Sequence, residues 1–342
     1  MLSRLIAFVM SVTLLLFAYP NTTKADTLSD KTTFIVYGDL PYMITLADGR
    51  TDEEVFFEEI IPAINEHEEV PFVIHLGDLS RPEYTCSDEL LQSFKDVWDN
   101  DIDKPIFYTP GDNDWTDCDR EKLSNPQSEL ARLASVRKIF FSEPKTLDPE
   151  WQYEQNSDLP ENALWIYDGV LFVTEHMIGT NNGRDEILQD DPATILAEVE
   201  KRDQANREWL DYAFYLAQNN NVEAVVLASH LDPFGAENGE NDAFTRCTNK
   251  PAYAGFCQQI QTFAHKLQKP VLYVHGDTNA YCYDKPFNAE LAPNIWRLNA
   301  PGDIKYIDAS LISYDRSNQD LPFEVTGLLS GEVPPEICDY SR

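Results

Sequence analysis

Four aspartates each follow a glycine at the end of a short apolar run. The pairs are Gly38-Asp39, Gly77-Asp78, Gly111-Asp112 and Gly276-Asp277. The runs have the length and the β-branched and aromatic composition of buried strands, and glycine allows a sharp exit from each strand. Several carboxylates delivered to one crevice would repel one another unless a multivalent cation lay among them. The spacing therefore predicts a metal site at the ends of several strands.

The elements around these motifs alternate between strands and helices. Strands are expected at 33–37, 71–76 and 105–108, with helices near 52–66 and 87–98 between them. Right-handed crossovers would make the three strands parallel and would bring their Gly-Asp loops to one edge of a sheet.

Antiparallel pairing enters in the second half of the chain. Asp168-Gly169 separates two apolar runs and predicts a hairpin. The remaining expected elements are helices near 127–141, 192–217 and 255–267, and strands at 224–228, 270–274, 295–298 and 304–309. Mixed strand directions imply an α/β fold, a layered sandwich of two mixed β-sheets flanked by helices. No linker or repeat divides the chain, so we expect one large domain.

Residues 1–25 have the pattern of a secretory signal peptide. Arg4 precedes an apolar stretch over 5–19, and the small residues Thr23 and Ala25 offer a cleavage point. This stretch is shorter than the ~20 residues that a bilayer span needs, and no later segment approaches that length. The sequence therefore predicts an exported protein, periplasmic or extracellular, without a membrane span.

All six cysteines follow the predicted signal peptide, and an even number in an exported protein favours disulfides. The expected pairs are Cys86–Cys118, Cys247–Cys257 and Cys282–Cys338. The first two cysteines each follow a Gly-Asp loop, the next two bracket one short segment, and the last two remain. A zinc site of four cysteines is the alternative, although no Cys-x-x-Cys spacing occurs.

The chain is strongly acidic. It has 26 lysines and arginines against 59 aspartates and glutamates, which gives a formal net charge of -33. No cluster of basic residues is visible, so the composition argues against duplex nucleic acid as a partner. Hydrophobic residues make up 43% of the chain, which is ample material for a packed core.

Taken together, these motifs resemble those of the calcineurin-like metallophosphoesterase superfamily. The matching residues, in order, are Asp39, Gly77-Asp78, Gly111-Asp112-Asn113-Asp114, His230 and Gly276-Asp277-Thr278-Asn279. The Gly-Asp-Asn-Asp and His-Gly-Asp-Thr-Asn variants look like those of an atypical bacterial branch. The resemblance implies a metallophosphoesterase-like domain over 30–325 and a C-terminal tail over 326–342 that Cys338 ties down.

The resemblance also implies a set of metal ligands. They are Asp39, Asp78, Asp112, His230, Asp277 and Asn279. Asp78 would bridge two cations, with Asp39 and the Asn279 carbonyl on the first and the other three residues on the second. An oxygen-rich set with one imidazole favours Mn or Mg; Ca is a further candidate, and Zn is less favoured.

The sequence departs from the superfamily pattern at four positions. Pro41, Asp277 and Asn279 stand where the superfamily has ligand histidines. Asn113 takes the catalytic position of the histidine that protonates the leaving group. The first site is therefore weak in ligands, and the resemblance implies one or two bound ions.

The resemblance implies an exported metal-dependent phosphoric ester hydrolase that acts on a small phosphorylated substrate. A hydroxide bridging the cations would attack phosphorus in line. Asn181, Asn182 and Arg184 could present amides and a guanidinium to that substrate, and a plain tight turn is an equally good interpretation.

Two other functions stay open. The missing imidazoles favour a degenerate, non-catalytic member that binds a ligand or a cation in the acidic crevice. Paired carboxylates could instead serve a glycoside hydrolase. The sequence leaves the natural substrate and the oligomeric state open.

Overall fold

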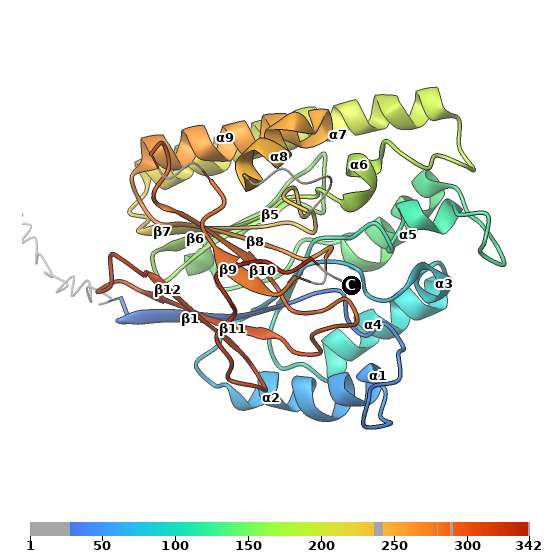
Figure 1. Cartoon of the computed structure of the whole chain (residues 1–342), viewed down its shortest axis with the longest axis horizontal. Helices are drawn as coiled ribbons and strands as arrows, with labels where there is room; N and C mark the ends of the chain where they lie inside the picture. The colour runs from blue at the N-terminus through green and yellow to red at the C-terminus, as the bar shows by residue number, and fades with distance from the viewer. Residues whose placement is uncertain (1–27, 236–241, 279, 288–289, 341–342) are drawn as a thin grey trace, which may run out of the picture.

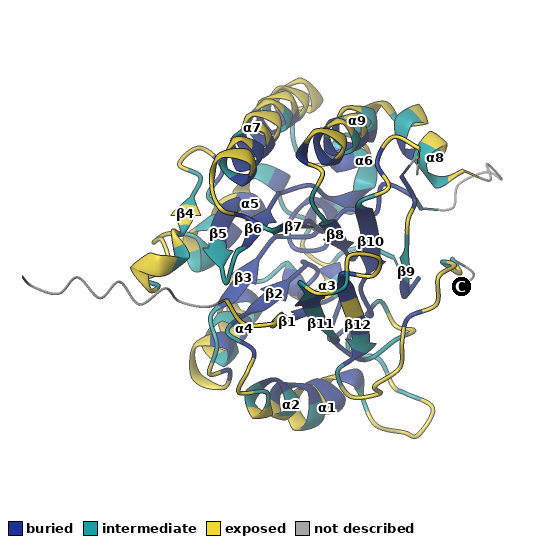
Figure 2. Ribbon diagram, turned by 90° about the vertical axis from the view of Figure 1, so that its left-hand side faces the viewer, coloured by how far each residue is buried: buried dark blue, intermediate teal, exposed yellow. Residues whose placement is uncertain are grey.

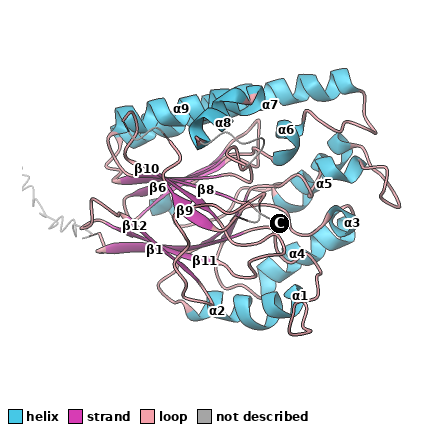
Figure 3. Ribbon diagram, in the orientation of Figure 1, coloured by secondary structure: helices cyan, strands magenta, loops and turns pink. Residues whose placement is uncertain are grey.

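The computed structural model describes residues 28–235, 242–278, 280–287 and 290–340, so the predicted signal peptide lies outside the described residues. Within them, a 5-stranded and a 7-stranded sheet pack face to face. Helices cover the outer face of each sheet (Figures 1 and 3). The predicted α/β sandwich of two mixed sheets flanked by helices is confirmed.

The first sheet has the strand order β12-β11-β1-β2-β3. Its strands are β1 (Lys31–Tyr37), β2 (Val73–His75), β3 (Ile106–Tyr108), β11 (Ser310–Asp315) and β12 (Phe323–Gly327). The strands β1, β2 and β3 are parallel, as predicted, whereas β11 and β12 pair in antiparallel fashion. The Gly-Asp loops that follow the three parallel strands therefore leave the sheet at one edge.

The second sheet has the strand order β4-β5-β6-β7-β8-β10-β9. Its strands are β4 (Glu154–Gln155), β5 (Ala163–Tyr167), β6 (Val170–Thr174), β7 (Ala224–Ala228), β8 (Val271–His275), β9 (Cys282–Asp284) and β10 (Ile295–Asn299). The β5–β6 hairpin turns at Asp168-Gly169, as predicted, and both residues have a positive φ. The strands β6, β7, β8 and β10 are parallel.

Two sets of helices flank the sheets. The first sheet is covered by α1 (Asp52–Val55), η1 (Phe56–Ile60), α2 (Ile61–Glu66), α4 (Asp88–Asn100) and α5 (Glu129–Phe140). The second sheet is covered by α7 (Pro192–Asn219) and α9 (Pro251–Leu267). Shorter helices are α3 (Pro82–Thr85), η2 (Thr116–Asp119), η3 (Pro149–Trp151), α6 (Gly179–Gly183) and α8 (Ala243–Asn249).

Side-chain caps fix where several helices begin. Thr51 and Glu54 form a capping box at the start of α1, and the Ser87 side chain accepts a hydrogen bond from the backbone at the start of α4. Asp191 caps α7 in the same way. These caps are visible in the sequence, which is why the predicted helix starts lie close to the observed ones.

Strand β1 shows why the apolar runs appear continuous. Phe34 and Val36 pack between the sheets, whereas Ile35 and Tyr37 pack against the helices. Because both faces are buried, no polar residue interrupts the run. Figure 2 shows both sheets buried beneath helices whose outer sides are exposed.

One predicted strand is wrong. Residues 304–309 form no strand, and β11 begins only at Ser310. The backbone N–H of Asp303 donates to the Asp39 carbonyl over 3.0 Å, and Gly302 packs directly against Gly38 and Asp39. The chain is therefore held at the end of β1 before pairing with that strand can start.

Three disulfides join Cys86–Cys118, Cys247–Cys257 and Cys282–Cys338, which are the pairs expected from the sequence. All six cysteines are used, so none remains for the alternative zinc site. The last bond fastens the C-terminal segment to the start of β9. Among the described residues, no helix combines the length and the apolar composition needed to cross a bilayer.

Candidate metal centre

Loops from both sheets meet at the carboxyl ends of their parallel strands. Asp39, Asp78 and Asp112 follow β1, β2 and β3, while His230 and Asp277 follow β7 and β8. The two sheets therefore each supply part of one cluster, and four of the five side chains are buried. Asn279, the sixth predicted ligand, lies outside the described residues.

His230 lies at the centre of this cluster. Its Nδ1 lies 2.8 Å from the Leu76 carbonyl, to which it can donate, and this leaves Nε2 with a lone pair. Nε2 lies 3.5 Å from Asp78 Oδ1, 3.4 Å from Asp112 Oδ1 and 3.6 Å from Asp277 Oδ1. It is fully buried and has no hydrogen-bond partner among the described residues. A buried nitrogen aimed at three carboxylates fits a cation ligand.

Two groups of potential ligand atoms lie close enough to share a cation. One group contains Asp39, Asp78 and His230, and the other contains Asp112, His230 and Asp277. Within each group the atoms lie within 4.8 Å of one another. His230 belongs to both groups, whereas the resemblance makes Asp78 the shared ligand. The roles of the individual ligands remain predictions.

Crowding of the carboxylates changes their proton affinities. Burial raises the pKa of Asp39 to about 7 and raises the pKa values of Asp78 and Asp277 well above the usual range, with repulsion from Asp112 adding to the burial. Burial opposes ionisation of Asp112 too, but the adjacent His230 outweighs it and lowers that pKa. Burial works against a charged His230, yet the surrounding carboxylates raise its pKa well above the usual value. Positive charge, from protons or from a metal cation, therefore stabilises the cluster.

Tyr42 reaches into the first group of ligands. Its hydroxyl lies 2.7 Å from Asp78 Oδ2 and 3.2 Å from Asp39 Oδ1. Asn113, the predicted catalytic residue, donates from its side chain to the same hydroxyl over 3.1 Å and from its backbone to Asp78 over 3.0 Å. No pattern around Tyr42 in the sequence indicated this contact, because it depends on the path of the loop after Asp39.

Asp114 organises the loops that carry the ligands. Its carboxylate accepts hydrogen bonds from the backbone N–H groups of Asp78, Leu79 and Gly111 over 2.8–2.9 Å. The Tyr108 hydroxyl donates to the same carboxylate over 2.7 Å. Asp114 is fully buried, so these bonds replace its hydration. The last acid of the Gly-Asp-Asn-Asp motif is therefore structural.

Glycines line the cluster because no side chain would fit. A Cβ on Gly276 would overlap Asp39, and a Cβ on Gly111 would overlap Asp78. A Cβ on Gly179 would overlap both Asp112 and Asp277. The close approach of the backbone explains why glycine precedes two of the predicted ligands.

The segment of α6 forms a wall beside Asp112. Thr180, Asn181 and Asn182 all have left-handed backbone conformations, with φ between 51° and 56°. The Thr180 hydroxyl donates to Asp112 Oδ2 over 2.9 Å. Arg202 is buried and donates to the carbonyl of Asn182 over 2.5 Å and to its side-chain oxygen over 3.1 Å. Arg202 thus holds the turn that positions Thr180.

The three predicted substrate contacts have different surroundings. Asn182 is fully buried, and its amide donates to Asp203 over 2.8 Å, so its role is structural. Arg184 pairs with Glu200 and Asp203. Asn181 alone of the three lines the open cleft beside the metal cluster.

That cleft has a volume of about 660 Å³. Asp277 and Thr278 lie on its inner side, and Lys250, Tyr253 and Tyr340 are among the other lining residues. The size is that of a small-molecule site, since such sites span roughly 300–1,000 Å³. Tyr340 reaches the cleft from the C-terminal segment that the Cys282–Cys338 disulfide anchors.

The architecture is a layered α/β sandwich of two mixed sheets with the acidic and histidine cluster at the carboxyl ends of its parallel strands. No family model and no curated protein matches the chain.

Two solved structures are similar in fold. A structure of PhoD has a TM-score of 0.53 at 11% sequence identity, and the match covers 85% of this chain and 65% of the PhoD chain. A structure of GAP50, the anchor in the inner membrane complex of Plasmodium, has a TM-score of 0.50 at 12% identity. That match covers 89% of this chain and 86% of the other. At such low identities these similarities concern the fold alone.

Proposed function

We propose that this protein is an exported, metal-dependent phosphoric ester hydrolase. The observation that carries the proposal is the unpartnered, buried Nε2 of His230, which faces carboxylates of three different loops. An imidazole and carboxylates together make a ligand set for a divalent cation, and the adjacent cleft has the size of a site for a small phosphorylated substrate.

The residues divide into three tasks. Asp39, Asp78, Asp112, His230 and Asp277 would hold the cation or cations. A bound divalent cation would supply positive charge to the phosphoryl oxygens and acidify the attacking water. Asn113 cannot protonate a leaving group, so phosphoesters with acidic alcohols should react best. Lys250 and Asn181 line the cleft and can face the substrate.

The choice of metal follows from the donor atoms. Four carboxylates and one imidazole favour Mn or Mg over Zn, with Ca as a further candidate. Whether one or two ions bind depends on the first group, where the Tyr42 hydroxyl lies within hydrogen-bond distance of both Asp39 and Asp78 and can donate its one proton to either of them.

This position of Tyr42 favours one alternative, a non-catalytic member that binds a cation or ligand. The hydroxyl donates its one proton to a carboxylate of this pair, and burial raises the pKa of Asp39 to about 7 and that of Asp78 well above its usual range, so protons can take the place of a cation in the first group. One similar fold belongs to a protein described as an anchor, and a fold by itself does not imply catalysis. The glycoside hydrolase alternative gains no such support.

Export rests on the pattern of residues 1–25 and is supported by the three disulfides, which persist in oxidising compartments. We also propose the domain boundaries of 30–325 and 326–342, with Cys338 holding the tail.

The test is hydrolysis of p-nitrophenyl phosphate and bis-p-nitrophenyl phosphate by purified protein with added Mn, Mg or Ca. Asp78→Asn should lower metal-dependent turnover by more than roughly 100-fold, because it removes a ligand charge. Asp320→Asn, the same change at an exposed site on another surface, should leave turnover intact. Metal binding without turnover would favour the non-catalytic alternative. The absence of both metal binding and turnover would refute the hydrolase and the cation-binding alternative.

A further inference from the structure

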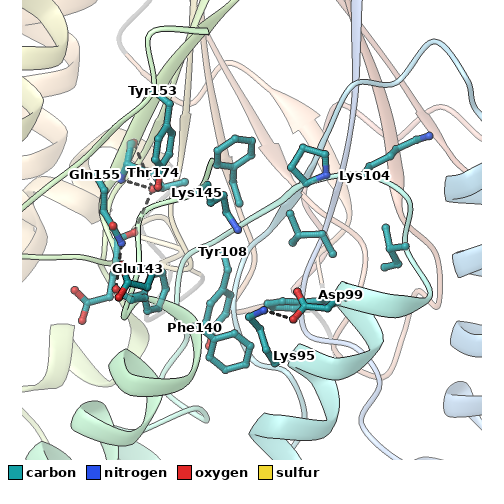
Figure 4. A pocket seen from close by; sticks show the side chains of 18 of the residues that line it. Lys95, Asp99, Lys104, Tyr108, Phe140, Glu143, Lys145, Tyr153, Gln155 and Thr174 are labelled. Atoms are coloured by element: carbon teal, nitrogen blue, oxygen red, sulfur yellow. Dashed lines mark hydrogen bonds and ion pairs between the residues drawn. The ribbon is translucent and has the colours of Figure 1, made fainter. Parts of the chain in front are cut away.

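A second cavity opens at the outer edge of β3, the last strand of the first sheet (Figure 4). None of the five candidate metal ligands that the structure describes lines it. Its volume is about 400 Å³, and Phe107, Tyr108, Phe140 and Tyr153 supply aromatic surface. An open cavity of this size, with both aromatic and charged lining residues, lies within the range of small-molecule sites, roughly 300–1,000 Å³.

An ammonium group is directed into this cavity. Lys145 belongs to an exposed loop, but its Nζ turns back to 5.9 Å from the centre of the Phe107 ring. Figure 4 shows Lys145 pointing inward above Tyr108, with Lys95 on the opposite side, whereas Lys104 points away. Lys145 is exposed as a residue, but neighbouring groups remove part of the hydration of its ammonium and, together with the charge of Lys95, lower its pKa to about 8.

Lys145 lacks the acidic partner that Lys95, another lysine of the cavity, has. Lys95 pairs with Asp99 one helical turn away. Among the described residues, the Lys145 ammonium forms no hydrogen bond or ion pair at all. Acidic residues outnumber basic ones by 59 to 26 in this chain, so a shortage of carboxylates does not explain the missing partner.

We propose that this cavity binds a small organic acid. Its anionic group would lie between Lys145 and Lys95, and its flat or apolar body would pack against Phe107, Tyr108 and Phe140. The anionic group of the ligand would form an ion pair with the Lys145 ammonium. The aromatic rings would cover the body of the ligand. This proposal is independent of the proposed hydrolase activity.

The acids of the cavity limit the charge of the ligand. Asp99 pairs with Lys95, and Glu161 pairs with Arg137. Asp103 and Glu143 add further negative charge to the lining. A monoanion such as a carboxylate or sulfonate is therefore favoured over a multiply charged phosphate.

Binding can be followed with anilinonaphthalene sulfonate, an aromatic monoanion whose fluorescence rises in apolar surroundings, and with benzoate as a competitor. Saturable binding of the probe to the full protein, displaced by benzoate, is expected. Lys145→Met keeps the length of the side chain but removes its charge, and should weaken probe binding by about tenfold or more. Lys145→Arg should retain most of the affinity.

The matched control is Lys266→Met, which removes the same charge from an exposed site on α9 and should leave the affinity unchanged. Equal affinities of the parent protein and Lys145→Met would overturn the proposal. So would probe binding that does not saturate or that benzoate does not displace. Turnover of phosphoesters plays no part in this test, so its outcome stands apart from the proposed function.

Discussion

The two nitrogens of His230 have different surroundings, and as a result a proton and a metal ion compete for the same nitrogen, Nε2. Nδ1 faces the Leu76 carbonyl, so an added proton or cation must go to Nε2. Burial opposes a charge on His230, but the surrounding carboxylates outweigh it and raise the pKa of His230 well above its usual value, which favours a proton on Nε2 of the metal-free ring. A cation must then displace that proton.

The first prediction is that Mn²⁺ binding strengthens as pH rises. Asp39 has a pKa raised to about 7, so it is protonated below that pH and becomes available as a ligand above it. Each proton released on binding adds up to about tenfold in affinity per pH unit below the pKa of its group. Titration calorimetry between pH 6 and 8, in two buffers of different ionisation enthalpy, measures both affinity and proton release.

Affinity that is constant over this range, or binding without proton release, would contradict this reading of the site. Asp320→Asn is a suitable control because its carboxylate is exposed and distant in sequence from every ligand loop.

At the scale of elements, the site depends on short segments that leave strands and turn at once. The left-handed turn at 180–182 brings the Thr180 hydroxyl to Asp112, and Arg202 on α7 fixes the turn from behind. Groups that orient a metal ligand in this way are worth about 10- to 100-fold in metal affinity.

A second prediction concerns this hydroxyl. Thr180→Val preserves the branched shape but removes the hydrogen bond to Asp112, and should weaken Mn²⁺ binding by on the order of tenfold. Thr180→Ser keeps the hydroxyl and should stay close to the parent. Calorimetric affinities decide the matter, and equal losses in the two variants would mean that packing, not the hydroxyl, matters at this position.

The helices and strands were largely predictable, because the spacing of apolar residues and the residue composition of each segment reflect which of its faces are buried. Apolar runs on both faces of β1, β2 and β3, the Asp168-Gly169 turn and the caps of α1 and α4 are local signals. The strand expected at 304–309 failed because a tertiary contact between Asp303 and Asp39 overrides local propensity.

The site was predictable only in part. The aspartates that follow strands can be recognised in the sequence by the Gly-Asp motif. The structure brings five of the predicted ligands together. Tyr42, Thr180 and Arg202 act through loop conformation and long-range packing, so their spacing in the sequence carries no signal. The same packing explains why Asn182, expected to face a substrate, is buried.

At the scale of the whole molecule, a small part of the large negative charge is gathered at one site. The chain has a formal net charge of -33, and four carboxylates share one largely buried cluster in which no described lysine or arginine forms an ion pair with them. Such a cluster repels itself, so the folded state gains more than the unfolded state does when a divalent cation enters.

The third prediction is therefore that Mn²⁺ raises the melting temperature and that a chelator reverses the rise. A free-ion concentration of about 100 times Kd should add ~2.7 kcal/mol to the free energy of unfolding. Scanning calorimetry at constant ionic strength separates this effect from general screening of the acidic surface. Asp277→Asn should lose most of the rise, and an equal rise in that variant would place the stabilising ion elsewhere.

The turn at 180–182 also has a handedness of its own. Its φ and ψ values, 51° to 56° and 40° to 43°, are the mirror image of a right-handed helix. Each L-residue there bears a cost of roughly 1–2 kcal/mol that a D-residue would not. A semisynthetic chain with D-alanine at Asn181 should therefore keep this wall of the site. The protein has built one side of its cleft from a fragment of mirror-image helix.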